Sequence, residues 1–134
     1  MPTSTELLAH ITRNLDAERG PALAGDAAAI WQALDGRFAP LLGPLSTELL
    51  FLRSLDANAS AFPWLPAATI PGVGKAPFAD FERSLALQPP EQVLAANRAL
   101  LANWLAGLTR LIGARLAERF LLALFPEPDA HKNT

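Results

Sequence analysis

The polar residues best placed for chemistry lie within an apolar helical pattern between positions 90 and 125. When this segment is projected as one helix, at about 100° per residue, its leucines and Trp104 fall on one side. Asn97, Arg115 and Arg119 fall on that same side. A charged side chain on an apolar face needs a partner, because a buried and unpaired charge is strongly unfavourable. The pattern therefore marks a candidate polar site.

Three interpretations of this pattern remain open from the sequence. In the first, the two arginines bind an anionic group in a polar pocket framed by Asn97 and Trp104. In the second, Asp56, which falls between leucines of an earlier helical pattern, forms an internal ion pair with Arg115. In the third, Gly113 shifts the helical phase and turns both arginines to the solvent.

Other signatures of catalysis or metal binding are missing. His10 and His131 have no metal-ligating companion at helical spacing, and the chain has no cysteine. The segment 72–75 (Gly-Val-Gly-Lys) resembles the end of a phosphate-binding loop but lacks that motif's first glycine and its final hydroxyl residue. No serine lies in a nucleophile-elbow context. We therefore expect no enzymatic activity, no metal and no cofactor.

The bulk composition fits a single domain with an apolar surface. The chain has 134 residues, of which 51% are hydrophobic and 18% charged, whereas about 25% is the usual charged fraction. With so few charged residues, either the core is large or some apolar surface faces a partner. The net charge of −2 argues against nucleic-acid binding. No signal peptide and no span of the roughly 18 apolar residues that a membrane helix needs is visible, so we expect a cytoplasmic protein.

The spacing of apolar residues predicts an all-α fold, a compact bundle of about five helices. Prolines, glycines and capping residues set the expected bounds. We expect one domain over residues 1–126, followed by a polar, disordered tail over 127–134. The predicted helices span about 4–19, 26–39, 44–61, 77–87 and 90–125, with Gly113 able to bend or break the last.

Two segments are more apolar than is usual for a surface helix or a connecting loop. The third predicted helix contains four successive apolar residues at 49–52, which point all round the helix and indicate a central or interfacial position. A long Pro-rich apolar loop over 62–77 joins the third and fourth helices, and such a loop packs over a core or a pocket. The candidate interface residues are Phe51, Phe62, Trp64 and Phe125. The alternative is that all four are ordinary core residues, which is the commoner role for any one of them.

One internal similarity relates the two halves of the chain. Leu41-Leu42-Gly43 is followed by Glu48, Leu50, Phe51 and Leu52, and Leu111-Ile112-Gly113 is followed at the same offsets by Glu118, Phe120, Leu121 and Leu122. A duplicated helix pair and chance in a leucine-rich chain both explain this match. The abundance of leucine favours chance.

The sequence resembles no family that would assign a function. Its low charge and apolar segments favour a non-enzymatic protein-interaction or regulatory module that self-associates as a homodimer, with aromatic side chains as anchors. The alternative is a small-molecule-sensing domain whose apolar pocket uses Arg115 as the anion anchor.

Overall fold

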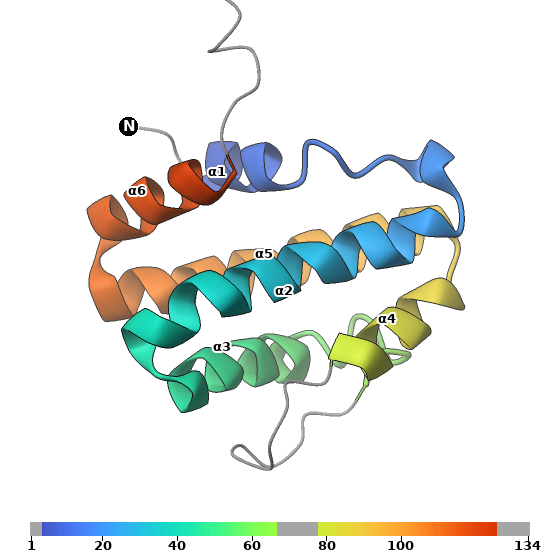
Figure 1. Ribbon diagram of the computed structural model, residues 1–134. Coiled ribbons are helices and arrows are strands. Elements are labelled where there is room, and N and C mark those ends of the chain that lie inside the picture. Colours follow the sequence, from blue (N-terminus) through green and yellow to red (C-terminus); the bar gives the residue numbers. More distant parts are fainter. Residues whose placement is uncertain (1–3, 67–77, 126–134) are drawn as a thin grey trace, which may run out of the picture.

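Two long helices that run in the same direction form the centre of the molecule (Figure 1). They are α2 and α5; α3 and α4 lie on one side of this pair, and α1 and α6 lie on the other. The structure is a computed structural model that describes residues 4–66 and 78–125. In chain order the α-helices are α1 (Ser4–Ile11), α2 (Ala22–Leu42), α3 (Pro44–Ala57), α4 (Phe78–Ala86), α5 (Pro90–Ile112) and α6 (Ala114–Leu124).

The all-α prediction is confirmed for the described part of the chain, which contains no strand and has six α-helices where about five were expected. The additional helix arises at Gly113, which separates α5 from α6. The described helices include none with the length and hydropathy of a membrane span. Residues 67–77 of the expected loop and the predicted tail at 127–134 lie outside the described residues.

Some helix ends differ from the predicted ones for local reasons. The first helix ends at Ile11 rather than near residue 19, because Asp16 accepts a hydrogen bond from the backbone N–H of Glu18 and starts a short 3₁₀ turn there. The second helix begins at Ala22 and continues past Pro40, which was expected to stop it. A proline removes one helical N–H, but the N–H of Gly43 still pairs with the carbonyl of Ala39, and the helix ends at Leu42, two residues after the proline.

The same glycine corner joins α2 to α3 and α5 to α6. Gly43 has φ 90° and ψ 145°, and Gly113 has φ 88° and ψ 155°. Only glycine adopts this region without strain. Each glycine donates its N–H to the carbonyl four residues earlier and accepts from the N–H four residues later. Each corner thus ends one helix and starts the next within a single residue.

The two corners coincide with the internal similarity at positions 41–43 and 111–113. Some positions separated by the same offset are buried in both halves, including Leu34 with Trp104 and Phe51 with Leu121, whereas Leu52 is buried and Leu122 is exposed. The corner geometry thus repeats in the two halves, but the burial repeats only in part. The two pairs differ in packing, since α3 contacts both α2 and α5, whereas α6 packs mainly on α5 and α1.

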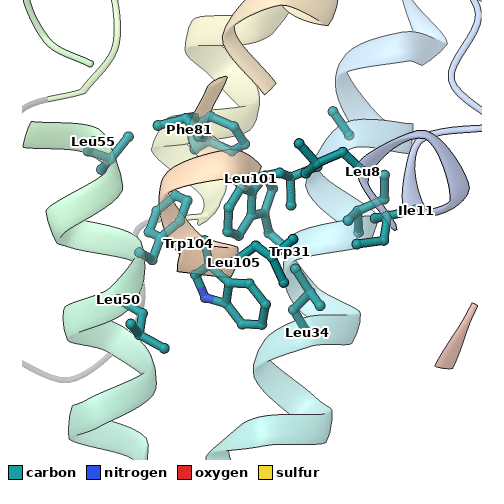
Figure 2. Packing of buried hydrophobic residues seen from close by; sticks show 14 of the residues in the cluster. Leu8, Ile11, Trp31, Leu34, Leu50, Leu55, Phe81, Leu101, Trp104 and Leu105 are labelled. Carbon is teal, nitrogen blue, oxygen red and sulfur yellow. The ribbon is translucent and has the colours of Figure 1, made fainter. Parts of the chain in front are cut away.

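An aromatic cluster between the two central helices holds the core together. Figure 2 shows Trp31 and Trp104 close to one another among the leucines of α2 and α5. Their ring centroids are 6.2 Å apart and nearly perpendicular, and Trp31 also lies 4.9 Å from Phe51 of α3. The Trp31–Trp104 pair is edge-to-face, and such a pair contributes roughly 0.5–1.5 kcal/mol beyond burial of its area, whereas the Trp31 and Phe51 rings are tilted by 59°. The cluster therefore fixes α3 against the central pair.

Candidate functional site

The five residues of the predicted polar pocket do not come together. Asn97 and Trp104 are buried in the core. Arg115 and Arg119 are exposed on α6, and Asp56 is exposed near the end of α3. Among the described residues, neither Asp56 nor Arg115 has an ion-pair partner. The break after α5 gives α6 its own phase, which is the third of the interpretations above.

Asn97 serves the core through a hydrogen bond that crosses the two central helices. The indole Nε1–H of Trp31 donates to Asn97 Oδ1 over 2.8 Å, and both side chains are buried. The Asn97 Nδ2 group has no partner among the described residues. Buried polar groups without a partner are rare in folded proteins. The bond orients Trp31 at the centre of the aromatic cluster.

The four candidate interface residues lie in three separate parts of the structure. Phe51 is buried and packs on Trp31. Phe62 and Trp64 are half-buried after α3 and contact each other edge-on, and the Trp64 indole N–H donates to Gln92 Oε1 over 3.3 Å. Phe125 is half-buried after α6, where its carbonyl contacts the His10 ring. All four pack against the core, and they share no common surface.

Exposed leucines instead gather at the two glycine corners. The described residues expose six large hydrophobic side chains, and four of them lie within three residues of Gly43 or Gly113. Both corners lie at the same end of the molecule (Figure 1). We call these four residues the corner surface: Leu41, Leu45, Leu111 and Leu116, with exposed fractions of 50%, 51%, 57% and 43%.

Sequence reasoning missed the corner surface because it treated residues 90–125 as one helix. In that projection Leu111 and Leu116 fall on the buried face. The phase change at Gly113 moves Leu116 to the outside, whereas Leu111 is exposed in the last turn of α5, before the break. A usable signal was present, since a Leu-x-Gly sequence recurs at both corners, but it indicates exposure only once the glycine φ is known.

The charges around the corner surface are predominantly positive. Arg110, Arg115 and Arg119 are exposed on its α5–α6 side. Arg37 is half-buried, with its guanidinium carbon 4.6 Å from the centroid of the Phe120 ring. The acidic residues near the corners are withdrawn from solvent: Glu48 is buried, and Asp35 and Glu118 are half-buried. The surface therefore combines apolar area with accessible positive charge.

Several exposed carboxylates lie at the opposite end of the molecule. Asp16 and Glu18 lie just before α2, and Glu91 lies in the first turn of α5; all three are exposed. Asp26 forms a two-point ion pair with Arg19, with N–O distances of 2.8 and 3.2 Å. The hydrogen bond from Arg19 lowers the pKa of the Asp26 carboxyl.

One carboxyl near the corners has a perturbed pKa. Burial raises the pKa of Asp35, and the charge of the nearby Glu48 raises it further. Both effects disfavour the ionised form. No group of three or more metal-ligating side chains occurs among the described residues.

No protein-family model, curated protein or solved structure matches the chain. Any functional assignment therefore rests on the geometry and chemistry given above.

Proposed function

We propose that this chain is a non-enzymatic helical protein-interaction module that receives a partner protein on its corner surface. The observation that carries the proposal is the gathering of four exposed leucines at one end of the molecule, next to three exposed arginines. Scattered single leucines are ordinary on protein surfaces, whereas a contiguous apolar area bordered by polar groups is typical of an interaction site.

The leucines alone provide a moderate driving force. Burying one fully exposed leucine contributes about 1.5–3 kcal/mol. Since each of the four is close to half exposed, covering all of them contributes about 3–6 kcal/mol. Association loses translational and rotational freedom of similar or larger free energy. A stable complex therefore needs additional contacts, which the arginines supply to a partner with acidic side chains.

A second copy of the chain is the second candidate for this partner. In a symmetric dimer the same surface meets itself, so the exposed arginines of the two copies would repel one another. Glu118 favours the dimer, because this half-buried carboxylate lies on α6 between Arg115 and Arg119 and can face the arginines of the other copy. A different acidic protein avoids the repulsion entirely, and we therefore place it first.

Site-specific photo-crosslinking in the cells that produce the protein tests this proposal. A photoreactive amino acid is placed at position 45, on the corner surface, or at position 87. Leu87 is the matched control, since it is 83% exposed and lies after α4, away from both corners. We expect one discrete crosslinked protein from position 45 and none from position 87.

Two further variants identify the interaction. Leu41→Ser combined with Leu116→Ser removes apolar area, and Arg115→Glu inverts a charge; all three positions are exposed, so the fold is retained. Each should abolish the crosslink. Sedimentation of the purified chain then distinguishes a second copy, which doubles the mass, from a different protein. Equal crosslinking at positions 45 and 87, or a crosslink that survives both variants, contradicts the proposal.

A further inference from the structure

A groove between α3 and α5 forms a second candidate site, which borders the corner surface and shares Leu111 and Arg110 with it. Its cavity volume is about 410 Å³, which is within the usual range of small-molecule sites, about 300–1,000 Å³. An α-helix with side chains is about 10–12 Å across and needs more room. The groove therefore suits a small molecule better than a helical partner.

The floor and walls of the groove are largely apolar. Leu49 and Leu50 line it from α3, and Leu111 lines it from α5. Gly107 sets how closely the helices approach, because a Cβ atom at this position would lie 2.6 Å from Leu50 Cδ2. Ala106 lies beside Gly107 and is exposed. Small residues on α5 thus leave space above a leucine floor.

The charged groups of the groove are all cationic. Arg53 lines it from α3 and Arg110 from α5, and neither pairs with another described residue. Asn103 accepts a hydrogen bond from Asn58 Nδ2 through its Oδ1 over 2.7 Å, which leaves its own amide N–H groups as donors. No carboxylate of the described residues lines the groove. Its polar groups are therefore suited to a negatively charged group.

We propose that this groove binds an amphiphilic anion, a small molecule with an apolar chain and a carboxylate head. The chain lies along Leu49, Leu50 and Leu111, and the head lies between the guanidinium groups of Arg53 and Arg110. With one arginine on each side of the head, both guanidinium groups can form charge-assisted hydrogen bonds with its carboxylate. The site replaces the Arg115 anchor expected from the sequence with two arginines that face one groove.

A larger cavity elsewhere is less suited to this ligand. It has a volume of about 450 Å³ and lies between α1, α2 and Phe125. Its charged lining residues are Arg19 and Asp26, which already form an ion pair with each other. Their charges cancel, so an incoming anion gains no free cation there. The α3–α5 groove has the unpaired charges that this cavity lacks.

Titration with decanoate, followed by calorimetry and by backbone amide chemical shifts, tests the site. Decanol has a comparable chain without the charge, and acetate has the charge without the chain. We expect decanoate to bind and to shift amides in segments 46–57 and 103–111, with both comparison compounds at least about tenfold weaker. A hydrogen bond to a charged group contributes about 1.5–3 kcal/mol, so Arg53→Gln and Arg110→Gln should each weaken binding roughly 10- to 100-fold.

Three variants locate the binding in this groove. Arg98→Gln removes an exposed arginine of α5 that does not line the groove, and it should leave binding unchanged. Ala106→Phe fills the groove from an exposed position and should abolish binding while the fold is retained. Leu41→Ser weakens the corner surface only and should leave decanoate binding intact. Absence of decanoate binding, or equal affinity in the Arg53→Gln and Arg110→Gln double variant, overturns the proposal.

Discussion

Replacing Gly43 or Gly113 by alanine is expected to destabilise the protein, whereas replacing Gly36 by alanine is expected to stabilise it. The space around all three glycines is the same, because a Cβ atom added at any of them meets nothing within 4 Å. The backbone differs. The two corner glycines have φ near +90°, whereas Gly36 lies inside α2.

The size of the effect follows from the backbone alone. A non-glycine residue held in a sparsely populated region loses about 1–3 kcal/mol. Alanine inside a helix is favoured over glycine by about 0.5–1 kcal/mol. The corner variants and the Gly36 variant should therefore differ by about 2 kcal/mol or more. For a domain of this size, 1 kcal/mol corresponds to a shift in melting temperature of roughly 3–5 °C.

Urea unfolding followed by Trp fluorescence measures these differences, because Trp31 and Trp104 lie in the core. Equal slopes with urea concentration for all variants establish that only stability has changed. Since Gly43 and Gly113 have nearly the same φ and ψ, their variants should lose similar amounts. A Gly113→Ala protein as stable as the parent would show that α5 and α6 form one continuous helix, and the exposure of the arginines on α6 would then lack its cause.

Three further outcomes are expected from the core and its borders. Asn97→Ala leaves the Trp31 indole N–H unpaired in the core and should lower the free energy of unfolding by about 2–3 kcal/mol, measured with urea; a loss below about 0.5 kcal/mol would contradict the role of this bond. Asp35→Asn should raise the melting temperature at pH 7. The raised pKa of Asp35 means that its ionised form destabilises the fold, so this gain should vanish below about pH 4, where Asp35 is protonated in both states. Gly107→Ala should not show the stabilisation of Gly36→Ala, because its Cβ would lie 2.6 Å from a side-chain carbon of α3; an equal gain in urea unfolding would refute close packing there.

Much of the fold was predictable because helical spacing and proline positions are local signals. The starts of α3 at Pro44 and of α5 at Pro90 agree with the predicted starts near these prolines, since proline suits the first turn of a helix. The sequence did not determine whether Gly113 breaks the helix or lies inside it. Glycine is found both inside helices and at corners, and the difference depends on a φ angle that tertiary packing selects.

The candidate sites were less predictable because exposure depends on tertiary packing. The burial of Asn97 followed from its place on an apolar face, but its partner Trp31 lies 66 positions earlier in the chain, and no local pattern links them. Arg53 and Arg110 face one groove only because α3 folds back along α5. Their separation in the sequence is long, and neither interrupts an apolar pattern.

The two glycine corners connect the fold to the proposed function. At each corner a single glycine separates the end of one helix from the start of the next. No further described element covers the leucines beside it. Because α2 and α5 run in the same direction, both corners, and therefore both pairs of leucines, lie at one end of the molecule. A single corner would leave two exposed leucines, which is ordinary for a monomer surface. Its repetition in parallel places four exposed leucines at one end of the molecule, and the proposed function rests on this arrangement.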